Sequence, residues 1–182
     1  MFATQLPSTE QNLILTGYIG PDMPQLGRQI ANRLNLPYTN VEGQIAERLD
    51  MTIDEIRDYF GETRLKAIEM EMVQEAALRR RTVIRISGRT LVHVDHLARL
   101  QATGPAICLT IALDAMLQRL HINMGARYHD PAERALALGE LKREWAVRGQ
   151  PGIHEVDTTY LDTTEIIEKV ALLWQSLAIE RA

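Results

Sequence analysis

Short apolar runs alternate with longer amphipathic segments along this 182-residue chain. The apolar runs predict five strands, at residues 12–16, 36–38, 82–86, 106–111 and 153–156. Helical spacing of the apolar positions predicts helices at residues 25–34, 42–49, 53–59, 62–80, 91–100, 113–120, 132–147 and 163–177. Residues 121–131 follow neither period, and we expect a loop or lid there. This alternation predicts a three-layer α/β fold, in which a five-stranded parallel sheet has helices on both faces.

The length and composition predict one domain at residues 12–182, preceded by a flexible, polar lead-in at residues 1–11. The net charge of −4 gives no bulk attraction to nucleic acid or to an anionic membrane, and no apolar stretch is long enough to span one. Cys108 is the single cysteine, which excludes an internal disulfide. It lies in an apolar run, and we expect it to be buried. One cysteine is typical of a reducing compartment, so we expect a cytoplasmic protein.

The stretch after the first strand has the frame of a phosphate-binding loop without its chemistry. Gly17 and Gly20 keep the spacing of a short G-x-x-G variant, in which a small residue, a glycine, a lysine and a Ser or Thr follow. The last three of those positions are Asp22, Met23 and Pro24. They bring a carboxylate to an anion site, remove the cation, and remove both an N–H and the hydroxyl that would bind magnesium. An ordinary strand–helix turn is the alternative. Pro24 suits the first turn of a helix, so we expect the helix itself to form.

The order and spacing of segments over residues 12–177 resemble the shikimate kinase family. GYIG and LGRQIANRLNLPY resemble its phosphate loop, first helix and second strand, and MTIDEIRDYFGETRLKAIEMEMVQEA resembles its substrate-binding helices. VIRISGRTL stands where the family has a strand ending in three glycines, and VDTT stands at its fifth strand and adenine loop. The resemblance implies a P-loop fold of the nucleoside-monophosphate-kinase type. The ligands should gather at the carboxyl ends of the strands, at residues 17–24, 39–42, 87–89 and after 111.

The resemblance carries over only part of the family's site. The family's Asp-x-Asp, which binds magnesium and the shikimate hydroxyls, falls on Asn40 and Glu42. Its substrate-binding arginine falls on Lys66, which keeps the charge but loses the bidentate fork. Its following glutamate is kept as Glu69, although an alternative is that Glu69 only pairs with Lys66 on the helix surface.

The remaining matches are mostly cations. The glycine trio corresponds to Ser87, Gly88 and Arg89, so a large cation stands where a ring would need room. The other implied matches are Arg143 after the lid, Arg127 in the lid and Arg119 on the adenine side. The alternative for Lys66, Arg127 and Arg143 is that they are solvated charges. Arg89 is expected either to contact a ligand carboxylate or to pair with Glu42.

Three functions stay open at this point. The first, which the missing phosphate ligands favour, is a binding or regulatory protein without phosphoryl transfer, since one lost electrostatic donor can cost ~10²–10³ in rate. Its cationic set would suit a small anion, such as an aromatic or alicyclic carboxylate, and we expect no cofactor. The second is an active kinase that uses ATP and Mg²⁺, with Arg28, Arg89 or Arg127 in place of Met23. The third is a subunit that pairs with a protein partner. The histidines have no recognisable metal-binding spacing, and we expect no metal site.

Overall fold

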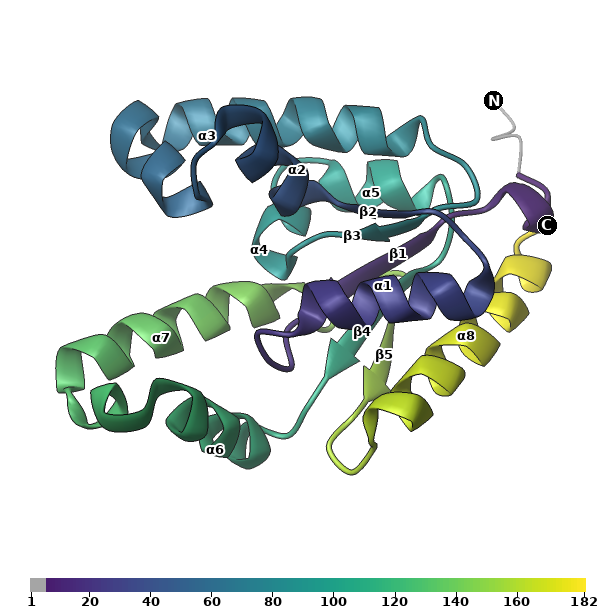
Figure 1. Ribbon diagram of the computed structural model, residues 1–182. Helices are drawn as coiled ribbons and strands as arrows, with labels where there is room; N and C mark the ends of the chain where they lie inside the picture. The colour runs from purple at the N-terminus through teal and green to yellow at the C-terminus, as the bar shows by residue number, and fades with distance from the viewer. Residues whose placement is uncertain (1–5) are drawn as a thin grey trace.

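The computed structural model describes residues 6–182, and the first five residues of the predicted lead-in lie outside it. Five parallel strands form one sheet in the order β2-β3-β1-β4-β5, which confirms the predicted fold class (Figure 1). Each predicted strand is present within one or two residues of its expected bounds. The strands are β1 (Leu13–Gly17), β2 (Tyr38–Asn40), β3 (Val83–Arg85), β4 (Ala106–Thr110) and β5 (Ile153–Asp157).

Helices cover both faces of this sheet (Figure 1). They are α1 (Met23–Leu34), α2 (Val41–Leu49), α3 (Ile53–Ala77), α4 (Gly88–Leu91), α5 (His96–Gln101), α6 (Leu113–Met124), α7 (Pro131–Glu144) and α8 (Thr163–Glu180). Short 3₁₀ turns lie at Ser8–Glu10, Gly125–His129 and Trp145–Val147. No helix of the described residues is long and apolar enough to cross a membrane.

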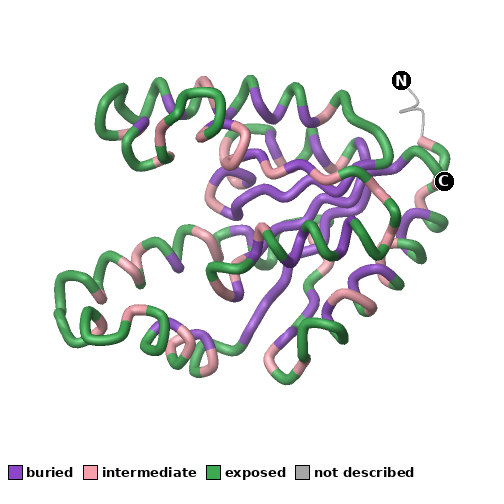
Figure 2. Tube along the Cα trace, in the orientation of Figure 1, coloured by how far each residue is buried: buried purple, intermediate pink, exposed green. Residues whose placement is uncertain are grey.

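The strands are apolar on both sides because each side packs against a helical layer. Leu13 and Leu15 point into the core beneath α1 and α8, whereas Ile14 between them points into the core beneath α3 and α5. Cys108 belongs to the second core and is fully buried, as predicted. Figure 2 shows this buried sheet between helices whose outer turns are exposed. Because helices cover both faces of the sheet, a ligand site is expected at the carboxyl ends of its strands.

Two predicted helices around residue 60 form one helix, α3, with a kink. Gly61 has φ 80° and ψ 164°, which only glycine adopts readily, so the break is where the sequence predicted it. A capping box begins this helix. The Thr52 hydroxyl accepts a hydrogen bond from the Glu55 backbone N–H at 3.2 Å, and the Glu55 carboxylate accepts one from the Thr52 N–H at 2.7 Å.

The structure differs from the prediction in the element bounds at residues 91–100 and 121–131, and the role of the second segment as a lid stays a prediction. The first segment is two short helices, α4 and α5, because the Ser87 hydroxyl accepts a hydrogen bond from the Thr90 N–H and starts a helix earlier. The second segment is not irregular. Helix α6 continues to Met124, a 3₁₀ turn follows, and α7 begins at Pro131, where Asp130 accepts hydrogen bonds from the N–H groups of the first helical turn.

Candidate functional site

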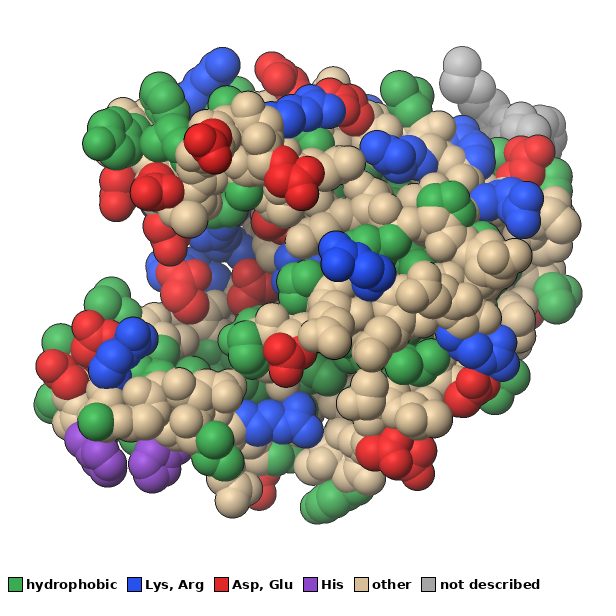
Figure 3. All heavy atoms as spheres, viewed as in Figure 1, with side chains coloured by type: hydrophobic (Ala, Val, Ile, Leu, Met, Phe, Trp, Pro, Cys, Tyr) green, Lys and Arg blue, Asp and Glu red, His purple; other side chains and the backbone are tan. Residues whose placement is uncertain are grey.

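Five charged side chains gather near the carboxyl ends of β2 and β3 and the start of α4. We call them the charged cluster; they are Glu42, Glu69, Arg85, Arg89 and Glu144. They come from α2, α3, β3, α4 and α7, and backbone and side-chain contacts at Ser87–Thr90 link them. Figure 3 shows a hollow between the α3 side and the α7 side of the molecule, with acidic and basic side chains inside it. We refer to this hollow as the cleft.

Arg85 is a buried cation at the end of β3 that the sequence reading missed. Its Nη1 donates to Oε2 of Glu42 at 3.0 Å and lies 3.4 Å from Oδ1 of Asn40. The other oxygen of Glu42 accepts a hydrogen bond from the Ser87 N–H at 2.9 Å. Arg85, and not Arg89, is therefore the partner of Glu42. A lone arginine within the apolar run TVIRI was the available signal, because a charge in a buried strand needs a partner.

Glu69 is a buried carboxyl that contacts three residues around α4. Thr90 donates to it at 3.3 Å, the His93 ring nitrogen lies 3.4 Å away, and the nearest guanidinium nitrogen of Arg89 lies 3.9 Å away. Burial, and then the charge of Glu42, raises the pKa of Glu69 to about 7. The Arg89 guanidinium, 3.9 Å away, is too distant to cancel the rise in the Glu69 pKa that burial causes. The surface pairing with Lys66 is wrong, because Glu69 is only 1% exposed.

Glu144 is a second carboxyl with a raised pKa, and the sequence reading missed it too. One of its oxygens accepts a hydrogen bond from the Gly88 N–H at 3.0 Å, at the start of α4. Burial, and then the charge of Glu42, raises the pKa of Glu144 to about 7. The approach of α7 to α4 requires a glycine, because a Cβ at Gly88 would lie 1.9 Å from the carbonyl oxygen of Glu144.

The other predicted ligand-binding cations make their ion pairs outside the charged cluster. Lys66 is about half exposed and has its ammonium 4.0 Å from Glu62, one turn earlier on α3. Arg143 is also about half exposed and pairs with Glu140 on its own helix. Arg127 is 70% exposed and lies 3.5 Å from Glu133. The structure thus brings Glu42, Glu69, Gly88 and Arg89 together, while the ligand-binding roles of the three outer cations stay predictions.

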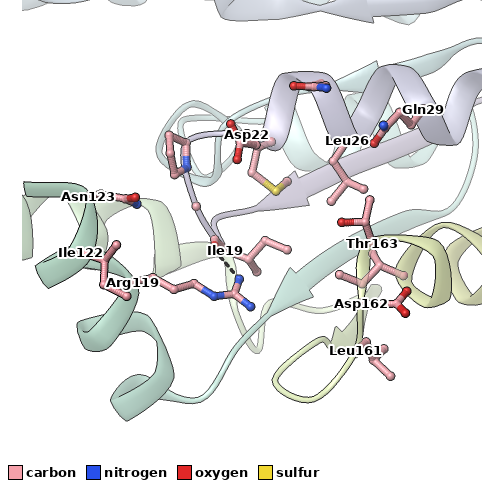
Figure 4. A pocket seen from close by; sticks show the side chains of 15 residues that line it. Ile19, Asp22, Leu26, Gln29, Arg119, Ile122, Asn123, Leu161, Asp162 and Thr163 are labelled. Atoms are coloured by element: carbon pink, nitrogen blue, oxygen red, sulfur yellow. Dashed lines mark hydrogen bonds between the residues drawn. The ribbon is translucent and has the colours of Figure 1, made fainter.

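The residues of the loop after β1 line a pocket of about 520 Å³ (Figure 4). The strand, glycine turn and helix follow each other as predicted, and Pro24 lies in the first turn of α1. Asp22 lines the pocket and makes no capping hydrogen bond, and Met23 is 2% exposed. Arg119 reaches the pocket from α6, but its Nη1 donates to the carbonyl oxygen of Ile19 at 2.8 Å. Ile122, Asn123, Leu161, Asp162 and Thr163 line the other side.

A second pocket, of about 510 Å³, lies between α6 and α7 and next to Tyr18. Its walls are mainly apolar, and its charged lining residues are Arg127, Glu133, Glu140 and Glu144. The indole N–H of Trp145 donates to the carbonyl oxygen of Tyr18 at 2.9 Å, which ties the end of α7 to the loop. Within residues 6–182, no three His, Cys, Asp or Glu side chains are arranged to hold a metal ion.

A family model described as "Shikimate kinase" matches residues 25–172. The shikimate kinase of Thermodesulfovibrio yellowstonii is 26% identical over 171 residues, which cover 92% of this chain and 97% of that protein. The shikimate kinase of Geobacter metallireducens is 30% identical over 114 residues, covering 63% of this chain and 64% of that one.

Solved structures agree with these sequence relatives. The crystal structure of the Bacteroides thetaiotaomicron shikimate kinase superposes with a TM-score of 0.73 at 25% identity, covering 92% of this chain and 98% of that one. A shikimate kinase from Acinetobacter baumannii, solved in complex with shikimate, superposes with a TM-score of 0.70 over 93% of this chain and 95% of that one. At 19% identity, that second likeness supports the fold alone.

Proposed function

The chain belongs to the shikimate kinase family, and we propose that it binds a small polar carboxylate of the shikimate type without transferring a phosphoryl group from ATP. The observation that carries the proposal is the loop after β1, where Asp22, Met23 and Pro24 replace the groups that bind phosphate. The carboxylate would occupy the cleft beside the charged cluster.

Phosphoryl transfer depends on positioning the phosphates and neutralising their charge. Met23 is buried and uncharged, and Asp22 adds a negative charge to the pocket wall. Arg119 is the one Lys or Arg among the residues that line this pocket, and it already donates to a loop carbonyl. Each absent donor is worth ~10²–10³ in rate, so the combined loss would leave little transfer.

The cleft supports a polar, hydroxylated carboxylate as the ligand. Glu42 can accept hydrogen bonds from ligand hydroxyls, and Arg85 and Arg89 supply cations near it. A relative of the same fold was solved with shikimate. Aromatic carboxylates such as benzoate are the alternative ligands, and they lack the hydroxyls that would bond Glu42.

The test is a titration of the purified protein with shikimate, quinate and benzoate, followed by calorimetry with ATP–Mg²⁺. We expect the hydroxylated carboxylates to raise the melting temperature and ATP–Mg²⁺ to give no heat of binding. An assay for ADP formation with shikimate present should show no turnover, with an active shikimate kinase as the positive control. Micromolar binding of ATP, or turnover above the buffer blank, would overturn the proposal.

A second candidate function is an active shikimate-type kinase that uses ATP and Mg²⁺ through an atypical loop. The comparisons favour it, because relatives aligned over more than nine-tenths of this chain carry the name shikimate kinase. In that case a cation from outside the loop must replace Met23. The ADP assay decides between the two candidates, since only the kinase consumes ATP in a shikimate-dependent way.

A further inference from the structure

The guanidinium of Arg85 is buried, and two of its three nitrogens make no hydrogen bond within residues 6–182. Its side chain is 10% exposed, and Nη1 makes the contacts with Glu42 and Asn40. Nε is buried with no hydrogen-bond partner, and Nη2 makes no hydrogen bond within residues 6–182. A buried donor without a partner is costly, and Nε is such a donor, so an acceptor that bonded Nε and Nη2 together would stabilise this edge of the guanidinium.

Glu42 cannot fill that edge in the arrangement seen. One of its oxygens is bonded to Arg85 Nη1, and the other accepts from the Ser87 N–H. The Glu42 carboxylate therefore uses only one of its two oxygens to bond the guanidinium. A bidentate pair elsewhere in the chain shows what the free edge can do, since Nε and Nη2 of Arg33 bond the two oxygens of Glu168 at 2.5 and 2.8 Å.

The free edge lies at the carboxyl side of the sheet. Arg85 is the last residue of β3 and is in register with Asn40 on β2 and Leu15 on β1, two residues before Gly17. Burial raises the pKa of Tyr18 in the loop after β1 and that of Glu144 on α7, and the charge of Arg85 acts in the opposite direction on both. Tyr18 and Glu144 both line the pocket between α6 and α7. An acceptor for Arg85 would therefore come from a ligand at this carboxyl edge of the sheet.

We propose that Arg85 binds the oxyanion group of the ligand, a carboxylate or a phosphate, with Nη2 as the first point of contact, while Glu42 positions the guanidinium. The inference rests on the proposed function, because it concerns the ligand of the same cleft. It assigns the anchoring role to Arg85 on β3 instead of to Lys66 or Arg143. An arginine matches two oxygens of an oxyanion in one plane, which a lysine cannot do.

A protein-borne guanidinium also makes binding independent of a divalent cation. The contact is between Arg85 and the oxyanion, so chelation of free metal leaves it unchanged. The carboxyls of Glu69 and Glu144 stand nearby, and their raised pKa values reduce the negative charge that an entering anion meets at neutral pH.

The experiment is calorimetry in EDTA with two probes, inorganic phosphate and shikimate. The main variant is the double change Arg85→Met with Glu42→Gln, which removes both buried charges together so that neither is left alone. Arg85→Lys keeps the charge and loses the fork. Arg64→Gln on the exposed surface of α3 is the matched control for the loss of one positive charge. Circular dichroism establishes that each variant is folded.

We expect at least one probe to bind the wild type and Arg64→Gln equally in EDTA and with Mg²⁺. The double variant should bind it at least ~10-fold more weakly, and Arg85→Lys should fall between them. Unchanged binding by the double variant, binding that requires Mg²⁺, or no binding of either probe at millimolar concentration overturns the inference. A loss confined to Arg143→Gln also overturns it and leaves the proposed function intact. Turnover of ATP refutes the proposed function but does not affect the phosphate result.

Discussion

Nη1 of Arg85 donates to Oε2 of Glu42 at 3.0 Å, and both side chains are about nine-tenths buried. Breaking such a pair from one side leaves an uncompensated buried charge, which costs about 3–5 kcal/mol. We expect Glu42→Gln alone to lower the free energy of unfolding by that amount and the double change with Arg85→Met to lower it much less. Urea denaturation of the two variants measures the difference. Equal losses in the two variants would mean that the pair carries no coupling.

Restoring the phosphate-binding residues of the loop after β1 tests whether the rest of the nucleotide site can still bind ATP. The triple change Asp22→Gly, Met23→Lys and Pro24→Ser replaces the carboxylate, the buried thioether and the proline with the groups of a phosphate loop. We expect measurable ATP–Mg²⁺ binding by calorimetry, but not full kinase activity, because Asn40 offers magnesium only a neutral oxygen. Full activity in the triple variant would contradict the role given to Asn40.

The raised pKa of Glu69 predicts a pH dependence of stability. Its folded-state pKa is about 7, against an ordinary value of 4.5, so the folded protein holds the proton more tightly than the unfolded chain. The free energy of unfolding should therefore fall as pH rises from about 4.5 to about 7 and level off above. Glu69→Gln should remove about 1–3 kcal/mol of this fall between pH 5 and pH 8. Urea denaturation at both pH values measures it, with exposed Glu62→Gln as the control.

Gly88 sets the distance between α4 and the end of α7. A methyl group there would overlap the carbonyl oxygen of Glu144, so Gly88→Ala should separate the two helices and weaken the Gly88–Glu144 hydrogen bond. We expect a loss of about 1–3 kcal/mol in thermal or urea unfolding. Gly139→Ala is the control on α7, since a Cβ there meets nothing within 4 Å, and it should stabilise the helix by about 0.5–1 kcal/mol. Similar effects of the two substitutions would contradict the packing argument.

The order of strands and helices was readable because local patterns encode it. Runs such as LILTG and AICLT are apolar on both sides, which predicts buried parallel strands, and the box at Thr52 and the kink at Gly61 depend on neighbours in the chain. The segments that were misread, residues 91–100 and 121–131, were decided by side-chain caps from Ser87 and Asp130. Such caps are also local, and the sequence contained them.

The pairing of charges at the site could not be predicted from the sequence, because it depends on how neighbouring strands and helices align in the folded chain. The sequence alone determined the fold, the glycine frame at Gly17 and Gly20, and the residue types that fill the altered loop. Only the tertiary structure placed Arg85 opposite Asn40 on the neighbouring strand, brought Glu144 from α7 to Gly88, and left Arg143 pairing along its own helix. The physical reason is that a charge in a buried strand needs a partner that folding brings next to it. The partner of Arg85 is Glu42, which lies 43 residues away in sequence.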